Sequence, residues 1–125
     1  MSRPCGMKIC GTKKYYCSVE LTLQVIGGKW KPIIIYQLGN KGTLRFSEIK
    51  RSIPNITQKM LTQQLRELEA DGVIHREVYP QVPPKVEYSL TELGTTVMPV
   101  INSLCEWGRH YEDEFGMQAY VEEAS

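Results

Sequence analysis

The stretch Thr57–Gly72, TQKMLTQQLRELEADG, carries the signs of a complete helix. Thr57 belongs to the residue types whose side-chain oxygen caps a helix N-terminus, and Gly72 belongs to the type that ends one. Between them Leu61, Leu65 and Leu68 recur at helical spacing and predict one buried face. We therefore expect a helix over this stretch, with its other faces polar.

The residues before this helix predict a second, shorter one. Ser47 can cap a helix that runs to Ile53, where Pro54 ends it. Two helices with such a short connection, the second long and polar on one face, form a helix-turn-helix. Beyond the second helix, β-rich runs at 73–79 and 86–90 flank the stiff segment 80–85 and predict a hairpin. The expected fold class is mainly α with a small β-hairpin (α+β), a winged helix-turn-helix.

The polar face of the long helix suits the DNA major groove, which is about 12 Å wide and admits one α-helix. Glutamine can bond adenine, lysine and arginine can reach guanine or phosphate, and acids occur only at the far end of the helix. The predicted contacts on the helix are Thr57, Gln58, Lys59, Thr62, Gln63 and Arg66. The predicted phosphate contacts elsewhere are Arg45, Lys50 and Arg51 before the turn, and Arg76 and Lys85 near the hairpin tip.

Two further helices are expected before this unit. Residues 18–26 fit either a strand, because apolar residues alternate there, or a helix capped by Ser18 with Val19, Leu23 and Ile26 on one face. The cap favours the helix. Residues 29–38 predict a second helix, which Gly39 would end.

A long final helix is expected from Thr91 to about residue 115, with a kink at Pro99. At about 24 residues and 36 Å it is longer than a small winged core can cover, yet its apolar stripe continues to the end. The surplus apolar surface predicts a homodimer. The predicted interface residues are Leu21, Val97, Ile101, Leu104, Trp107, Tyr111 and Phe115.

Several blocks of sequence then occur in the order of a known family. They are Val25–Trp30 (VIGGKW), Leu44–Ile49 (LRFSEI), Gln58–Leu68 (QKMLTQQLREL) and Val82–Thr91 (VPPKVEYSLT), followed by Gly94 and by Pro99 through Gly108. Over 17–116 the chain resembles the HxlR-type family of bacterial winged-helix transcriptional regulators. The resemblance implies a cytoplasmic dimer that binds double-stranded operator DNA through two wings and two recognition helices. It also implies a helix over 18–26.

Composition limits the other possibilities. With 125 residues, 42% hydrophobic and 23% charged, the chain predicts one globular domain, and its apolar runs are too short for a bilayer. Residues 29–85 carry ten Lys or Arg against five acids, whereas residues 86–125 carry Arg109 against eight. This segregation favours a polyanion-facing surface. No nucleophile motif, phosphate loop or paired-carboxylate signature is present, so neither an enzyme nor a cofactor is expected.

Three of the four cysteines, Cys5, Cys10 and Cys17, lie near the N-terminus. Their spacing does not match a zinc site, and a cytoplasmic location disfavours structural disulfides. Cys17 directly precedes the predicted helix and follows Lys13 and Lys14, a setting that favours a reactive thiolate. Some members of the resembled family carry a cysteine at this place and respond through it to oxidants or electrophiles. Cys17 is therefore the redox-sensing candidate, and the fourth cysteine, Cys105, is expected to be a small core residue.

The expected organisation is a flexible basic arm over 1–17, the winged domain with its dimerisation helices over 18–116, and an acidic tail over 117–125. Two alternatives to a thiol-switched regulator remain open. A small apolar effector could bind between the dimer helices and the winged core, near Trp30, Trp107 or Tyr111. A winged-helix dimer could instead bind a protein, with its polar helix face incidental.

Overall fold

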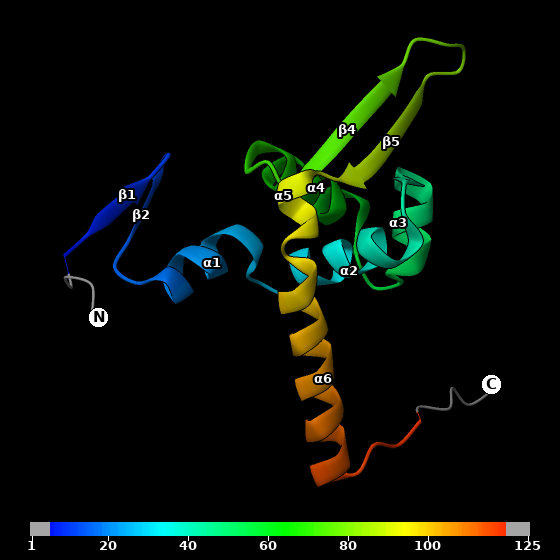
Figure 1. Ribbon diagram of the computed structural model, residues 1–125. Coiled ribbons are helices and arrows are strands. Elements are labelled where there is room, and N and C mark those ends of the chain that lie inside the picture. Colours follow the sequence, from blue (N-terminus) through cyan, green and yellow to red (C-terminus); the bar gives the residue numbers. More distant parts are fainter. Residues whose placement is uncertain (1–5, 120–125) are drawn as a thin grey trace.

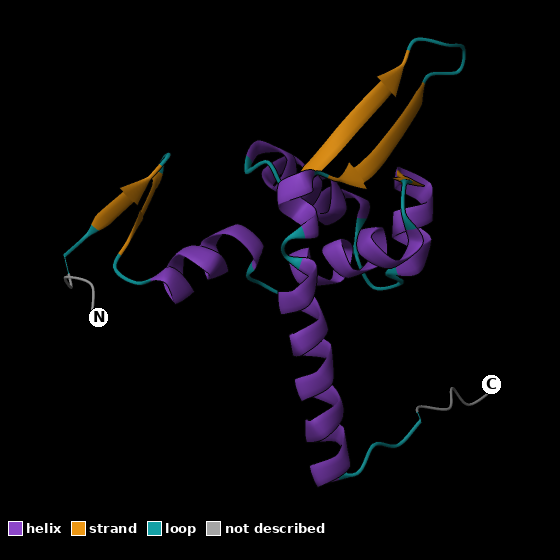
Figure 2. Cartoon of the chain, viewed as in Figure 1, coloured by secondary structure: helices purple, strands orange, loops and turns teal. Residues whose placement is uncertain are grey.

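The computed structural model describes residues 6–119. Six helices and five strands follow one another along these residues (Figures 1 and 2). In chain order they are β1 (Lys8–Cys10), β2 (Lys13–Tyr15), α1 (Ser18–Ile26), α2 (Lys31–Lys41), β3 (Leu44–Arg45), α3 (Phe46–Ser52), α4 (Gln58–Ala70), β4 (Ile74–Tyr79), β5 (Lys85–Leu90), α5 (Glu92–Thr95) and α6 (Met98–Phe115).

The expected winged helix-turn-helix is confirmed. Helices α3 and α4 are joined by a short connection, and β4 and β5 form an antiparallel hairpin that projects from the helices (Figure 1). The short strand β3 adds to the other edge of β5, so the sheet order is β3-β5-β4. Apolar residues of α2, α3, α4 and the first residues of β4 form the core beneath it. This arrangement holds α4 against the sheet and leaves its outer face uncovered.

Helix α1 spans residues 18–26 as the favoured alternative predicted, but its cap differs. The N-cap is Cys17, with extended backbone and no capping hydrogen bond from its side chain. Helix α3 likewise begins one residue before the expected cap, Ser47. Its N-cap is Arg45, whose backbone N–H donates to the Glu48 carboxylate at 2.9 Å. The side chain of the third helical residue can cap a helix N-terminus, as can that of the N-cap residue. The prediction of Ser47 as the cap considered only the second kind.

Gly39 does not end α2, which continues to Lys41 and stops at Gly42, whose φ is +83°. A Cβ atom on Gly39 would lie 2.3 Å from the Met98 sulfur. The glycine is therefore where α2 passes close to α6, a requirement set by tertiary packing rather than by the helix end.

The predicted final helix is two helices. Thr91 caps the short α5, accepting a hydrogen bond from the Gly94 N–H at 3.0 Å. Pro99 lies in the first turn of α6, where its missing N–H costs no hydrogen bond, so it starts this helix instead of kinking it. Helix α6 then extends well beyond the other helices (Figure 1).

The sequence predicts a flexible basic arm over 1–17, but residues 8–15 of it form the β1–β2 hairpin. The strands pair from Lys8↔Tyr15 to Cys10↔Lys13 around Gly11, whose φ is +61°. The hairpin is attached at two points. Lys13 forms an ion pair with Asp71 at 3.1 Å, and the Gln24 side chain donates to the Lys14 carbonyl at 2.8 Å. Cys5 lies outside the described residues.

Candidate nucleic-acid interface

The N-terminal half of α4 is built as the sequence predicted. The Thr57 hydroxyl accepts a hydrogen bond from the Met60 N–H at 3.1 Å, which caps the helix. Leu61, Leu65 and Leu68 are buried in the core. This fixes the opposite face toward solvent, where Gln58, Lys59, Gln63 and Arg66 are exposed. Thr62 is half-buried, and its hydroxyl donates to the Gln58 carbonyl at 2.9 Å.

The C-terminal half of α4 is held by ion pairs to three different elements. Glu67 meets Lys31 of α2 at 3.4 Å, and Glu69 meets Arg76 of β4 at 3.3 Å. Asp71, the residue that ends the helix, meets Lys13 of β2 at 3.1 Å. From the sequence, these acids were expected only to lie away from the bases. In the structure they also help to orient the helix, because each pairs with a cation of another element.

Lys59 and Arg66 have no ion-pair partner within residues 6–119. The acids of α4, Glu67 and Glu69, come after Arg66, so the exposed face before them carries positive charge without a paired acid. The helix of 13 residues is about 20 Å long, and this exposed face is accessible to the floor of a major groove.

The predicted phosphate contacts before the turn are on the surface. Arg45 and Arg51 are exposed, and Lys50 is half-buried. Lys50 and Arg51 lie in the last turn of α3, where cations also stabilise the helix dipole.

The hairpin departs from expectation. Arg76 is near its base, opposite Tyr88, and not near its tip. Lys85 is on the tip side, but it lies 3.7 Å from Glu87 and its ammonium is 4.9 Å from the centre of the Tyr79 ring. Both hairpin cations are therefore engaged within the protein. The tip itself, residues 80–84, carries no charged side chain, and Val82 is fully exposed.

A small hollow of about 220 Å³ separates α4 from the hairpin base and is lined in part by Arg66, Glu69 and Tyr88. Burial raises the pKa of the Tyr88 hydroxyl, and the Glu69 carboxylate adds to that effect against the opposing Arg76 and Arg66 charges. The hydroxyl therefore stays protonated at neutral pH and can both donate and accept a hydrogen bond.

Sequence reasoning missed Lys31, whose side chain is among the most buried charged groups of the structure. Lys31 is only 7% exposed, at the start of α2. Its methylene stem lies in the core region while its ammonium reaches Glu67. The only sign of this ion pair in the sequence is the group of acidic residues at the end of α4, and their positions do not indicate which cation they meet.

The HxlR-like helix-turn-helix family model matches residues 25–115, which include α2 to α6. The chain belongs to the HxlR-like family. The HTH-type transcriptional regulator YtcD of Bacillus subtilis (strain 168) is 60% identical over 110 residues, which cover 84% of this chain and 86% of YtcD. This HxlR-like chain is thus a transcriptional regulator of the helix-turn-helix type.

Two solved structures of the redox regulator HypR are similar to this chain. Its reduced form is 58% identical, with a TM-score of 0.75, and the match covers 79% of this chain and 97% of HypR. Its oxidised form is 56% identical, with a TM-score of 0.71, over 84% of this chain and all of HypR.

Ile101 was predicted at a dimer interface but is 3% exposed and packs in the core of its own protomer. Val97 is half-buried against the same core. Leu21 is half-buried in α1. The remaining predicted residues, Leu104, Trp107, Tyr111 and Phe115, are 52%, 64%, 48% and 73% exposed. The apolar stripe of α6 therefore divides into an inward part near its start and an uncovered outer part.

Residues 6–119 offer neither a metal site nor a membrane-spanning helix, but they carry free thiols. No three His, Cys, Asp or Glu side chains lie close enough there to hold a metal ion. No helix among them has the length and hydropathy to cross a membrane. Cys10 and Cys17 are exposed free thiols, and Cys105 is half-buried.

Proposed function

We propose that this HxlR-like regulator is a homodimer that binds operator DNA through the N-terminal half of α4 in each protomer. The observation that carries the proposal is the division of α4. Its last residues pair with α2, β4 and β2, while Lys59 and Arg66 on the exposed face have no ion-pair partner within residues 6–119. Such a helix can enter the groove without rearranging.

The outer part of α6 supports the dimer. Trp107 and Tyr111 have ring centres 5.5 Å apart, and Tyr111 and Phe115 stack at 4.5 Å. Rings that pack on each other yet remain about half exposed leave a contiguous apolar surface, which marks an interaction site. Two-fold pairing would place the recognition helices about 34 Å apart, one turn of DNA.

We propose that oxidation or alkylation of Cys17 changes the affinity for DNA. Cys17 is an exposed thiol directly before α1, and HypR, to which this chain is similar, is described as a redox regulator. The supporting role expected of Lys13 is withdrawn because its ammonium pairs with Asp71.

The test is a gel-shift titration with DNA upstream of the gene for this chain. Diamide treatment should change the affinity of the wild-type protein at least about fivefold and leave Cys17→Ser unchanged. Cys105→Ser serves as the matched control and should respond like the wild type. An equal diamide response in Cys17→Ser would remove the thiol switch while leaving DNA binding intact.

The alternative, a scaffold that binds a protein, is separated by the charges of α4. Lys59→Ala and Arg66→Ala should each weaken DNA binding and reduce the slope of log K against log salt by about 0.9. Lys29→Ala, which removes an exposed cation beside Trp30, should leave the slope unchanged. Retained DNA binding and salt dependence in both α4 variants would favour the scaffold.

The proposal includes neither catalysis nor a cofactor, and it places the protein in the cytoplasm, where chromosomal DNA is accessible. Relatives of this chain are named as transcriptional regulators, which supports a role without catalysis and a place in the cytoplasm.

A further inference from the structure

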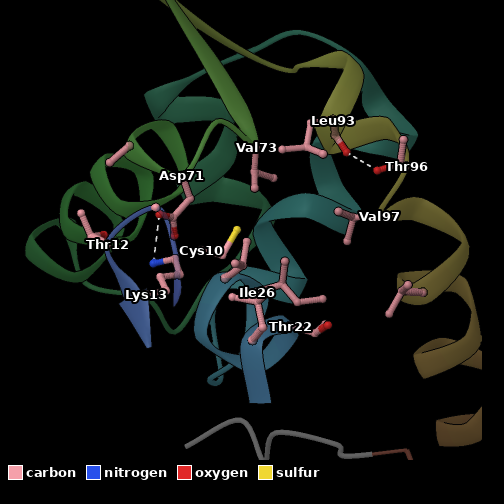
Figure 3. Close-up of a pocket in the computed structure, with 15 residues that line it drawn as sticks. Cys10, Thr12, Lys13, Thr22, Ile26, Asp71, Val73, Leu93, Thr96 and Val97 are labelled. Carbon is pink, nitrogen blue, oxygen red and sulfur yellow. Dashed lines mark hydrogen bonds and ion pairs between the residues drawn. The ribbon is translucent and has the colours of Figure 1, made fainter. Parts of the chain in front are cut away.

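A cavity of about 690 Å³ lies behind the attached end of α4 (Figure 3). It is open to solvent on one side and is bordered by the β1–β2 turn, one face of α1, the end of α4 and the junction of α5 with α6. Its apolar walls include Leu21 and Val25 of α1, Val73 before β4, Val97 before α6 and Val100 of α6. Small-molecule sites are typically clefts of about 300–1,000 Å³ with mostly apolar linings, and this cavity lies within that range.

Of the three threonines on the walls, Thr12, Thr22 and Thr96, two have hydroxyl groups that already donate a hydrogen bond. The Thr22 hydroxyl donates to the Ser18 carbonyl at 2.8 Å, and the Thr96 hydroxyl donates to the Leu93 carbonyl. An apolar wall offers water few hydrogen bonds, so an apolar molecule gains free energy by replacing it.

A charged pair on the wall can orient an occupant. The Lys13–Asp71 ion pair lies on the cavity wall, and its side chains are 25% and 19% exposed (Figure 3). An ammonium has three donors, and within residues 6–119 the Lys13 ammonium meets Asp71 as its only acceptor. Because the pair is neutral as a whole, an uncharged oxygen can bond the ammonium without leaving either partner uncompensated.

We propose that this cavity binds an uncharged, largely apolar small molecule with one carbonyl or hydroxyl oxygen, which acts as an effector. The effector role rests on the proposed DNA-binding function, whereas binding itself does not. The occupant contacts the hairpin, α1 and the last residues of α4 together. Its binding therefore stabilises the Lys13–Asp71 arrangement that orients the recognition helix.

The cavity lies between α1, the start of α6 and the winged core, as the sequence predicted for an effector site, but Trp30, Trp107 and Tyr111 do not line it. Val100, the last α6 residue on its wall, precedes Trp107 by seven residues, about 10 Å along the helix. Leu21 and Val97, which the sequence predicted at the dimer interface, lie on the wall. The proposal therefore requires a homodimer that forms through the aromatic residues of α6 and leaves these two residues to the occupant.

The experiment uses prodan, an uncharged naphthalene with one ketone oxygen, whose emission shifts to the blue in apolar surroundings. Titrating the full chain without DNA should give a saturable blue shift with one prodan per chain. Ala70→Phe adds a ring from the α4 wall and should raise the Kd at least about tenfold. Lys13→Met keeps the stem but removes the donor and should raise the Kd about fivefold. Gln81→Phe, which places the same ring at the exposed hairpin tip, should not change it.

A second readout does not depend on any variant folding. Cys10 lines the cavity and Cys17 does not, although both thiols are exposed. Saturating prodan should slow alkylation of Cys10 by N-ethylmaleimide in the wild-type protein, followed by mass spectrometry, and leave the rate at Cys17 unchanged.

Unchanged alkylation of Cys10, or equal prodan affinity in a folded Ala70→Phe, would overturn the proposal. Binding confined to the dimer-disrupting variant Trp107→Asp would overturn it too, because the partner protomer would then fill the cavity. Since prodan binding is measured without DNA, a failure to bind DNA is a separate result.

Discussion

At the residue scale, the acids at the end of α4 have a role that their position alone did not indicate. Glu67, Glu69 and Asp71 each meet a cation from a different element. Surface ion pairs are typically worth only about 0–1 kcal/mol. The pair with Lys31 differs because that lysine is only 7% exposed. Little water reaches its ammonium, so loss of the Glu67 carboxylate would leave the charge poorly compensated.

Removing the carboxylate should therefore cost more than removing the cation. Glu67→Gln leaves the Lys31 ammonium without a countercharge and should lower the free energy of unfolding by about 1–2 kcal/mol. Lys31→Met keeps the apolar stem and should cost less. Urea denaturation of both variants measures the difference, with Glu106→Gln on α6 as the exposed control. A larger loss in Lys31→Met would contradict this interpretation.

Tyr88 gives a prediction in alkaline solution. Its pKa is raised in the folded state, first by burial, so the fold favours the protonated phenol. The resulting stability is present below the unfolded pKa of about 10 and is lost as pH rises through the folded value. Tyr88→Phe should flatten the alkaline loss of stability and remove one late-ionising phenol from an ultraviolet titration. An unchanged titration curve would contradict the assignment.

At the scale of elements, α6 contains a glycine that its own protomer does not require. A Cβ on Gly108 would meet nothing within 4 Å, whereas a Cβ on Gly94 would lie 2.1 Å from the Val73 carbonyl oxygen. Glycine within a helix costs about 0.5–1 kcal/mol relative to alanine. Gly108 lies four residues after Leu104 and three before Tyr111, so it is on the uncovered apolar face, where a partner helix could approach closely.

We expect Gly108→Ala to weaken the dimer at least about tenfold, by analytical ultracentrifugation, because the added methyl separates the two helices. Gly94→Ala, in contrast, should destabilise the protomer by several kcal/mol, since the atom it meets is rigid backbone. A Gly108→Ala variant that is more stable and equally dimeric would place the partner elsewhere on α6.

At the scale of the whole molecule, the proposed DNA-binding surface of α4 and the proposed dimer surface of α6 lie in opposite parts of the structure (Figure 1). The recognition helix and the hairpin are at one side, and the aromatic residues of α6 are toward the far end. Two protomers joined through that end would present two reading helices at once, so DNA affinity should depend on dimerisation through linked binding.

Trp107→Asp should dissociate the dimer and weaken binding to an operator with two half-sites by at least about 100-fold. Binding to a single half-site should change little, because the contacts of α4 remain. Gel-shift titrations on the two DNA fragments make the comparison. Equal losses on both fragments would show that the substitution acts within the protomer.

The sequence predicted what depends on neighbouring residues. Thr57, the leucine stripe and Gly72 are local signals, and they placed α4 and its exposed face correctly. It failed where distant residues decide. The glycine at position 39 is required by the Met98 side chain, which lies far along the chain. The two paired strands around Gly11 have only three residues each and are too short to recognise from the sequence. The partners of Glu67, Glu69 and Asp71 come from 36, 7 and 58 positions away along the chain, and no periodicity reports such contacts.

Helix α4 is packed in the core along its length, from Leu61 to Leu68, and its ion pairs are gathered at one end. Its 13 residues span about 20 Å. A tilt of about 10° about the ion-paired end would displace Gln58 by about 3.4 Å, the spacing of one base pair. Leu61 is fully buried, so such a tilt would require the core to repack. The alignment of the exposed side chains with the bases is therefore set by the packing of the leucines, and the ion pairs add to it only at the far end.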